Sequence, residues 1–358
     1  MKEAYHVLGL MSGTSLDGLD MAHCSFWKEN DRWRFSLNKS TCIEYNLEFQ
    51  EKLKRAIELS ALDLLLLNNE FGQWMGEQAK IFIDRNQLEV DFISSHGHTV
   101  FHQIDKGLTY QIGAGQELAN TTSQKVICDF RTLDVTLGGQ GAPLVPMGDE
   151  LLFSDYDFCL NLGGISNASF RINGMRKAFD ISPANMLLSH ILKSTGKSFD
   201  DGGKIARSGK LVEPLWNALN ALGFYQQPSP KSLGYEWFRD EMMPLIDDSE
   251  ANVEDQLHTA VHHIAFQISE SLKRYATTDS KMLVTGGGAK NLFLIEMIQH
   301  YLGNSIEVVI PETSVVDFKE AIVFAFMGVL RSENEINCLS SVTGASRDSS
   351  SGVIFHPW

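Results

Sequence analysis

The chain has 358 residues and a formal net charge of −15, with 43% hydrophobic and 21% charged residues. One hydrophobic core rarely organises a chain of this length, so we expect two domains. The composition is that of a globular protein that folds over its whole length. The negative charge opposes binding to a nucleic-acid backbone, and a small-molecule ligand fits better.

Cysteine usage and hydropathy favour the cytoplasm. The five cysteines are scattered and form no C-x-x-C pair, which argues against a disulfide framework and a structural zinc site. The apolar run at the start is too short for a secretory signal. The most apolar run, 62–67, contains Asp63 and is far shorter than the ~20 residues of a membrane span. We therefore expect a cytoplasmic protein with no membrane partner.

The first half of the chain predicts a mixed α/β lobe. It opens with two β-rich runs that flank a Ser/Gly/Thr/Asp turn, and the alternation that follows predicts a third strand. These three strands are expected at 5–10, 19–27 and 33–45. Helices are expected at about 47–58 and 62–85, and later strands at 91–95, 110–112 and 125–128.

The same order of elements begins again in the second half. Strands are expected at 158–162, 166–172 and 176–180, with a helix from about 184. Further helices at about 250–276, 289–302 and 317–331 alternate with strands at 281–285 and 307–310. The repetition indicates a duplicated ribonuclease-H-like α/β unit, with ligands held in a central cleft between two lobes. We expect the first lobe to comprise 1–155 and about 332–358, and the second lobe 156–331.

Three glycine turns are candidates for a nucleotide site. The turn GTSLDG at 13–18 leaves backbone N–H groups free for anionic oxygens, but it lacks the lysine and the spacing of a Walker loop. Alone, it is equally well interpreted as a polar hairpin turn. The turns NLGGISN at 161–167 and TGGGAKN at 285–291 favour binding, because the latter leads from a strand into a helix N-terminus that attracts phosphate. The predicted cofactor-binding residues are Gly13, Thr14, Ser15, Leu16, Asp17, Gly18, Leu19, Asp20, Gly163, Gly164, Gly286, Gly287 and Gly288.

Phosphoryl transfer also requires carboxylates, to hold Mg²⁺ and to act as a base. The candidates are Asp17, Asp20, Asp180 and Glu320. Asp180 ends a strand shortly before Pro183, a position from which acids commonly project into a site. Helix capping by Asp180 or Ser182 is an equally good interpretation. Glu320 alone would be read as a solvated helix residue.

Two groups of histidines and one arginine deserve separate interpretations. His96, His98 and His102 follow a strand at a spacing that matches no helical metal motif, so hydrogen bonds to a sugar are a better interpretation than zinc binding. The group at 258, 262 and 263 has helical spacing, and we expect it to be a solvated helix face. Arg131 could bind an anionic substrate group or form a salt bridge with Asp129 or Asp134.

Together these segments resemble the anhydro-N-acetylmuramic acid kinase family, within the actin/hexokinase-type sugar kinases. The resemblance runs from Gly9 to the VTGA near the end of the chain. The segments that carry it are GLMSGTSLDGLD (9–20), SHGHTVFHQ (95–103), QIG (111–113), DFR (129–131), GGQGAPLVP (138–146), LNLGGISN (160–167), FDISPANMLL (179–188), PKSLG (230–234), TGGGAKN (285–291) and EA (320–321). PKSLG and EA contribute only through their order in the chain.

The resemblance implies an enzyme that uses ATP and Mg²⁺ to open the 1,6-anhydro ring of a cell-wall sugar, adding water at C1 and phosphorylating O6. It implies Asp180 as the general base, and phosphate binding by the segment from Gly13 to Asp20. Asp17 and Glu320 would hold Mg²⁺, and Gly286, Gly287 and Gly288 would lie near the nucleoside. The substrate contacts would be His96, Arg131 and Asn185. A homodimer is suggested by the resemblance alone.

The chain departs from the usual family pattern at two places. His98 stands where the family usually has glutamine, and the segment after Asp180 has Ile181, Ser182 and Ala184 where the family usually reads FDTGPGN. These departures leave another 1,6-anhydrosugar, such as levoglucosan, as an alternative substrate. A different class of function, a non-catalytic ATP-binding sensor or chaperone-like protein, is also compatible with this fold.

Overall fold

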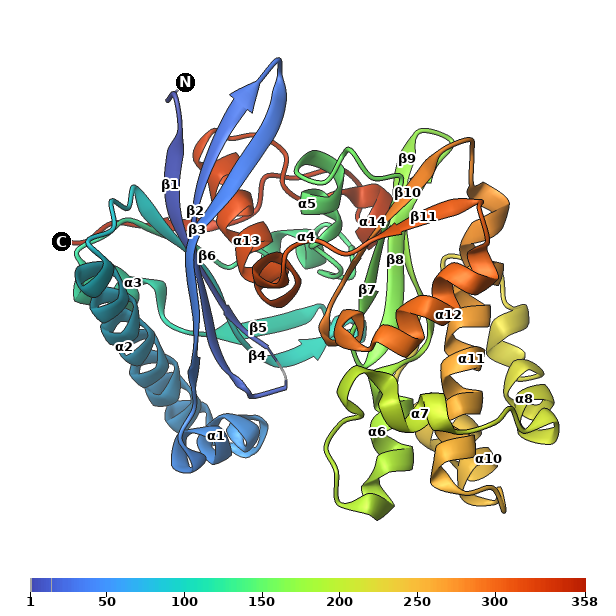
Figure 1. Cartoon of the computed structure of the whole chain (residues 1–358). Coiled ribbons are helices and arrows are strands. Elements are labelled where there is room, and N and C mark those ends of the chain that lie inside the picture. Colours follow the sequence, from blue (N-terminus) through green and yellow to red (C-terminus); the bar gives the residue numbers. More distant parts are fainter. Residues whose placement is uncertain (1, 14) are drawn as a thin grey trace. The chain divides into compact units, whose positions relative to one another are not determined.

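The computed structural model describes residues 2–13 and 15–358. The chain divides into two compact units, one formed by Met1–Leu152 with Phe318–Trp358 and the other by Phe153–Asp317 (Figure 1). The first boundary lies close to the expected one at 155. The second boundary differs: the first unit resumes at Phe318, whereas the sequence predicted about 332.

The shifted boundary is explained by helix α13 (Thr313–Ser332), whose greater part packs on the first unit. Ser94 donates a hydrogen bond to the Phe324 carbonyl (2.5 Å), and the rings of Phe26 and Phe326 lie 5.4 Å apart. A Cβ placed on Gly9 would come within 2.1 Å of the Ala321 carbonyl oxygen. Such close contacts explain why the residues from Phe318 onward belong to the first unit.

The first unit is built on one mixed sheet, in the order β12-β6-β4-β1-β2-β3, with β5 paired to β4. Its strands are β1 (Tyr5–Ser12), β2 (Gly18–Glu29), β3 (Arg32–Glu44), β4 (Phe92–Gln103), β5 (Leu108–Ile112), β6 (Val126–Cys128) and β12 (Val353–Phe355). β1, β2 and β3 form an antiparallel meander, whereas β4 runs parallel to both β1 and β6.

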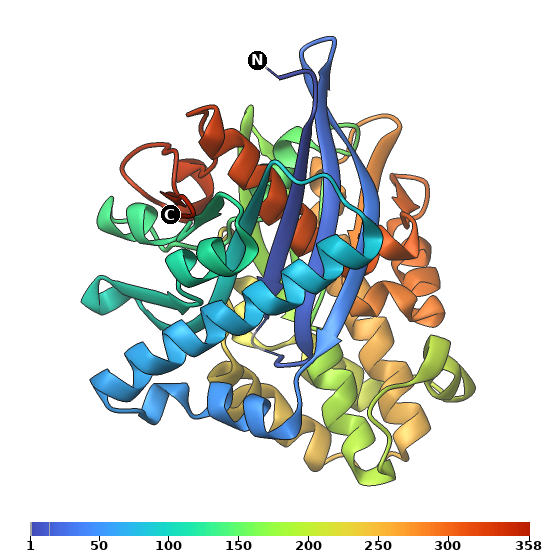
Figure 2. The ribbon, with the colours of Figure 1, turned by 90° about the vertical axis from the view of Figure 1, so that its left-hand side faces the viewer.

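Helices cover both faces of this sheet, α2 one face and α13 the other (Figure 2). The helices of the unit, besides α13, are α1 (Leu47–Lys54), α2 (Ala61–Asn86), α3 (Gly115–Thr122), α4 (Thr132–Thr136), α5 (Pro146–Leu151) and α14 (Ser340–Thr343). The helix predicted at 62–85 is confirmed as α2, which begins where the Ser60 hydroxyl accepts from the Asp63 N–H. Its buried face, including Phe71 and Met75, packs on sheet residues such as Leu10.

The second unit repeats this topology, in the order β11-β10-β7-β8-β9. Its strands are β7 (Phe158–Leu162), β8 (Ile165–Ile172), β9 (Met175–Pro183), β10 (Ser280–Thr285) and β11 (Ile306–Val309). β7, β8 and β9 are antiparallel, and β10 is parallel to both β7 and β11. With β5 and β12 set aside, the first sheet has the order β3-β2-β1-β4-β6, which matches the order β9-β8-β7-β10-β11 of the second sheet. This shared order confirms the predicted pair of ribonuclease-H-like α/β units.

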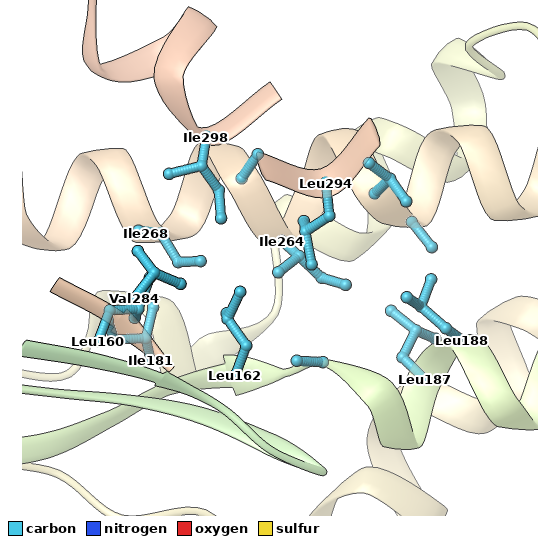
Figure 3. Packing of buried hydrophobic residues seen from close by; sticks show 14 of the residues in the cluster. Leu160, Leu162, Ile181, Leu187, Leu188, Ile264, Ile268, Val284, Leu294 and Ile298 are labelled. Carbon is cyan, nitrogen blue, oxygen red and sulfur yellow. The ribbon is translucent and has the colours of Figure 1, made fainter. Parts of the chain in front are cut away.

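The core of the second unit lies between its sheet and two long helices (Figure 3). The helices of the unit are α6 (Asn185–Leu192), α7 (Lys204–Ser208), α8 (Glu213–Asn220), α9 (Tyr235–Trp237), α10 (Met243–Asp247), α11 (Val253–Leu272) and α12 (Leu292–Leu302). Leu160 and Val284 from the sheet, Ile264 from α11 and Leu294 from α12 are fully buried in this core. Each such side chain stabilises the fold by roughly 1.5–3 kcal/mol.

The histidines of α11 contradict the sequence-based prediction of a solvated face. His263 is fully buried, and its ring bonds to the Tyr225 hydroxyl (2.9 Å) and to Asn220 Oδ1 (2.8 Å). His258 bonds to the Ala206 carbonyl and His262 to the Tyr301 hydroxyl, each at 2.9 Å. Helical spacing predicted a common face correctly but not its burial, because α7, α8 and α12 pack against it.

Candidate active site

Asp180 lies near the end of β9, at a β-bulge where the pairing with β8 shifts by one residue. Its Oδ2 accepts hydrogen bonds from the Leu233 N–H (2.8 Å) and the Ser232 hydroxyl (3.0 Å). Its Oδ1 receives no hydrogen bond from the residues that the structure describes. Burial raises the pKa of Asp180, while the bonds from Leu233 and Ser232 oppose the rise. One oxygen is thus held, and the other can take a proton.

The residues that follow Asp180, where the chain departs from its family pattern, are directed into the core of the second unit. Ile181, Ser182 and Ala184 are all at most 1% exposed. The Ser182 carbonyl accepts from the Ser166 hydroxyl (2.9 Å), and the Ser182 N–H donates back to that hydroxyl (3.2 Å). These departures therefore change buried packing beside Asp180 rather than an exposed surface.

Two of the predicted glycine turns lie side by side in the second unit. The Asn185 N–H donates to the Gly163 carbonyl (3.1 Å), and the Asn185 amide donates to the Leu162 carbonyl (2.9 Å). Gly286 has a positive φ of 82°, and a Cβ there would lie 2.5 Å from Asn161 Oδ1. The structure thus brings the turn at 163–164, the turn at 286–288 and Asn185 together.

The helix expected directly after the glycines starts slightly later. A short 3₁₀ turn, Gly287–Lys290, follows Gly286, and α12 begins at Leu292. The Asn291 side chain caps this helix by accepting from the Leu294 N–H (3.0 Å). Gly287 is exposed and Gly288 buried, so within this segment Gly287 presents its backbone to solvent.

The predicted phosphate loop is the turn between β1 and β2. Its Thr14 lies outside the described residues. The Leu16 N–H donates to the Gly13 carbonyl (3.2 Å), and Leu16 itself has a positive φ of 58°. Gln50 at α1 donates to the Leu16 carbonyl (3.0 Å), which ties the turn to the first helix.

The loop residues differ in what they can offer a ligand. Ser15 and Asp17 are exposed, Gly18 and Leu19 are buried, and Asp20 is half-buried. Leu19 is part of the hydrophobic core. Side-chain contacts to a phosphate or metal are thus open to Ser15, Asp17 and Asp20.

A buried hydrogen-bond chain lies under this loop. The Tyr45 hydroxyl donates to Ser12 Oγ (2.7 Å), and Ser12 Oγ lies 3.0 Å from His98 Nδ1. Burial lowers the pKa of His98 to about 4, so its ring is neutral at pH 7. His98 therefore supports the base of the loop, and its side chain is only 4% exposed.

Arg131 and His96 form one unit rather than two independent substrate ligands. Arg131 Nε donates to His96 Nε2 (2.9 Å), and Arg131 Nη1 donates to the Gly141 carbonyl (2.6 Å). His96 Nδ1 bonds to the Gly97 carbonyl (3.0 Å), so both nitrogens of this buried ring are occupied. Burial and the Arg131 charge lower the pKa of His96 well below 6.5. Arg131 retains Nη2, which donates to none of the described residues.

The salt-bridge interpretation of Arg131 does not match the structure. Asp134 is buried and accepts from the Gly141 N–H (2.7 Å) and the Thr343 hydroxyl (2.7 Å). Asp129 accepts from the Thr132 N–H (3.3 Å). Asp134 instead fixes the glycine loop whose Gly141 carbonyl holds Arg131.

Glu320, on α13, lies in the electrostatic range of Arg131 and Asp20. Desolvation by neighbouring protein groups raises the pKa of Glu320, although its side chain is partly exposed to solvent. The positive charge of Arg131 lowers this pKa, and the negative charge of Asp20 raises it. Asp20 also accepts a hydrogen bond from the Cys42 thiol. The acidic neighbour that interacts with Glu320 is thus Asp20, whereas we had paired Glu320 with Asp17. No cluster of three or more His, Cys, Asp or Glu residues suited to a metal occurs among the described residues.

A pocket of about 200 Å³ opens in the first unit beside the middle of β4 and the ends of β5 and β6. Besides His96 and Gly113, its lining includes polar side chains that we did not predict as ligands, which are those of Asn68, Tyr110, Gln111, Asp129 and Thr132. Gln111 and Asp129 lie in segments that resemble the family, and that is the only signal that could have identified them. Ser232 had the same kind of signal, in PKSLG, but nothing in one sequence shows that it reaches Asp180.

The whole chain matches a known family model. The model described as anhydro-N-acetylmuramic acid kinase matches residues 5–357. The chain belongs to the anhydro-N-acetylmuramic acid kinase family. An anhydro-N-acetylmuramic acid kinase of Nitrosomonas europaea is 31% identical over 365 residues, covering 98% of this chain and 99% of the relative. One of Aliivibrio fischeri is 33% identical over 366 residues, covering 97% and 98%.

Solved structures with more distant sequences also align with this member of the anhydro-N-acetylmuramic acid kinase family. The activator of 2-hydroxyisocaproyl-CoA dehydratase from Clostridium difficile, with bound ADPNP, has 11% identity and a TM-score of 0.45, covering 92% of this chain and 97% of that one. A ROK hexokinase from Thermus thermophilus has 13% identity and a TM-score of 0.40, covering 90% of this chain and 98% of that one.

Among the described residues, no helix has both the length and the apolar character to cross a bilayer.

Proposed function

We propose that this protein is an ATP-dependent kinase that opens the 1,6-anhydro ring of 1,6-anhydro-N-acetylmuramic acid with water and phosphorylates O6. The product is N-acetylmuramic acid 6-phosphate, an intermediate of cell-wall sugar recycling, and the reaction takes place in the cytoplasm. The observation that carries the proposal is the family match over residues 5–357. The half-buried Asp180 carboxylate, with one oxygen held and the other available, supports it.

Asp180 is the general base in this proposal. Its Oδ1 takes a proton from a water molecule, whose oxygen forms a bond to C1 of the sugar as the C1–O6 bond breaks. O6 takes the electron pair of that bond and attacks the γ-phosphorus of ATP, and ADP leaves. The raised pKa of Asp180 makes it a stronger base than an exposed aspartate.

The substrates contact several predicted residues in this proposal. The segment from Gly13 to Asp20 binds the phosphates through its backbone, and the turn at 286–288 lies near the nucleoside. Arg131 offers its free Nη2 to an anionic group such as the lactyl carboxylate, with His96 holding its guanidinium in place. Asn185 remains a proposed substrate contact, although its amide already donates to Leu162.

Mg²⁺ fits the acidic residues of the first unit. The ion typically takes one or two carboxylates together with phosphate oxygens and waters, and Glu320 with Asp20 provides such a pair. Asp17 is exposed in the loop and could bind waters of the ion. When bound, the ion neutralises charge that develops on the transferring phosphoryl group.

A coupled ADP-release assay tests the proposal. We expect turnover with 1,6-anhydro-N-acetylmuramic acid and much less with levoglucosan or hexoses. Asp180→Asn should lower kcat by roughly 100- to 10,000-fold, the usual contribution of a general base, while ATP affinity stays nearly unchanged. Asp248→Asn, at an exposed carboxylate of the same unit, is the matched control. Activity on hexoses only, or full activity of Asp180→Asn, would contradict the proposal.

A further inference from the structure

We propose that Ser232 is a positioning residue for the general base: with the Leu233 N–H, its hydroxyl fixes Oδ2 of Asp180 and leaves Oδ1 to accept the proton of water. This inference rests on the proposed function, since it assigns a role within the same reaction. It goes beyond that function because it identifies a segment remote in sequence, 231–233, as the support of the base.

Three hydrogen bonds connect Asp180 to this segment. The Asp180 N–H donates to the Lys231 carbonyl (2.9 Å), which holds the backbone of the base. Leu233 N–H and Ser232 Oγ then donate to the same carboxylate oxygen, at 2.8 and 3.0 Å. The terminal torsion of an aspartate is soft by itself, so two donors on one oxygen determine which oxygen remains available.

The segment is itself anchored to the second unit. The Lys231 ammonium donates to the Phe224 carbonyl (2.9 Å) and lies 4.2 Å from the centroid of the Phe224 ring. Leu233 is only 8% exposed and belongs to the buried residues of the chain. The neighbouring Tyr225 bonds to the buried His263 (2.9 Å). The support of Asp180 is thus fixed by core contacts on both sides of Ser232.

The effect of the Ser232 hydrogen bond on the pKa of Asp180 can be measured, because few other groups influence that pKa. No charged side chain contributes to its pKa shift, which has only burial, Leu233 and Ser232 as causes. Lys231 directs its ammonium to Phe224. The charged residues Arg171, Arg176 and Lys177 of β8 and β9 lie toward the other end of this hairpin. Asp180 lies opposite the uncharged Asn167. Removing the hydroxyl therefore changes one hydrogen bond and no ion pair.

The test compares Ser232→Ala and Ser232→Gly with wild type in two measurements. A donor to the carboxylate stabilises its ionised form, so loss of the hydroxyl should raise the pKa of Asp180 by roughly 0.5–1 unit. Because the base must be ionised, the acid limb of kcat/KM should move to higher pH by the same amount. At neutral pH kcat should fall roughly three- to tenfold through looser positioning, with KM for ATP unchanged.

Two further variants separate positioning from a general structural effect. Ser232→Thr keeps the hydroxyl and should return both the acid limb and kcat toward wild type. Ser208→Ala, at an exposed serine of the same unit whose hydroxyl donates to the Ile205 carbonyl (2.7 Å), should match wild type. If Ser232→Ala and Ser208→Ala share one pH profile, or if Ser232→Thr behaves like Ser232→Ala, Ser232 does not position the base.

The second measurement does not depend on turnover. The pKa of Asp180 is followed by NMR titration of protein with ¹³C-labelled aspartate, and its resonance is identified by its loss in Asp180→Asn. A wild-type protein without anhydrosugar-dependent ADP release would overturn the proposed function, while this titration would still decide the role of Ser232. An Asp180 pKa that is the same in wild type, Ser232→Ala and Ser232→Gly would overturn the inference.

Discussion

At the scale of single residues, the site places ionisable groups where burial opposes their charge. Asp180 is half-buried with a raised pKa, and its charged form is stabilised only by the two donors at Ser232 and Leu233. The chain keeps a carboxylate here although a neutral side chain would be easier to bury. Such a cost to folding is typical of residues retained for chemistry.

Asp180→Asn should therefore increase stability at neutral pH. The folded-state pKa of Asp180 lies above the usual value of 3.8 because of burial. The stability that the acid form provides is thus present below the unfolded pKa and is lost as the pH rises through the folded pKa. Asparagine does not titrate and its Oδ1 can accept the same two hydrogen bonds.

The measurement for this prediction is the melting temperature of both proteins at pH values from 3.5 to 7. The advantage of Asp180→Asn over wild type should grow across the interval just above 3.8 and then level off. A difference that is constant with pH, or that favours wild type more strongly at pH 7, would show that burial does not raise this pKa.

Single residues also show which parts of the site can be predicted from one sequence. The sequence predicted that Asp180 ends a strand before Pro183, but β9 continues to Pro183 and Asp180 lies within it, at a bulge. Ser232 was not predictable, because its contact with Asp180 depends on how a loop returns to β9. His96 was predicted as a sugar ligand from its place after a strand, but periodicity cannot show that Arg131 and Gly97 occupy its ring nitrogens.

At the scale of elements, α13 connects the predicted metal ligand to the first sheet. Its carbonyl at Ala321 passes so close to β1 that only glycine fits at position 9. Glu320 precedes Ala321, so this close packing determines how near Glu320 comes to Asp20. Sequence periodicity predicted a helix at 317–331, close to the observed α13, but it could not show on which sheet the helix packs.

Gly9→Ala should disrupt this packing. Its Cβ would lie 2.1 Å from the Ala321 carbonyl oxygen and 2.9 Å from the Ala325 Cβ, so β1 or α13 must move. We expect a loss of at least roughly 1–3 kcal/mol in the free energy of unfolding, together with weaker ATP-dependent activity as Glu320 is displaced. The measurement is denaturant unfolding alongside the ADP-release assay.

Gly223→Ala is the control for the element-scale prediction, because a Cβ there meets nothing within 4 Å. It should change the free energy of unfolding by less than about 0.5 kcal/mol. Equal effects of the two substitutions would mean that close approach of α13 and β1 is not required.

At the scale of the whole molecule, the chain contains two units of like topology, one continuous and one not. The second unit is a single stretch, Phe153–Asp317, whereas the first unit is completed by Phe318–Trp358. The repeat was predictable from element order, since each half begins strand, glycine turn, strand, strand. Whether the protein forms a homodimer stays a prediction based on resemblance.

The second unit should fold alone when it is cut at the observed boundaries. A fragment of residues 153–317 contains a complete five-stranded sheet and its own buried core, so we expect a soluble fragment with cooperative thermal unfolding. A fragment of 156–331, the lobe expected from the sequence, adds most of α13. That helix would expose Ile322, Val323 and Phe326, each 0% exposed in the full chain, and the fragment should aggregate.

Size-exclusion chromatography and circular dichroism of both fragments decide between these boundaries. Ile322→Asp with Phe326→Asp in the longer fragment should restore solubility, because the apolar face of α13 then no longer needs the sheet of the first unit. In the full chain the same pair should be severely destabilising, since both side chains are buried there. A soluble, cooperatively folded 156–331 and an aggregating 153–317 would instead assign α13 to the second unit and would contradict the boundary at 317.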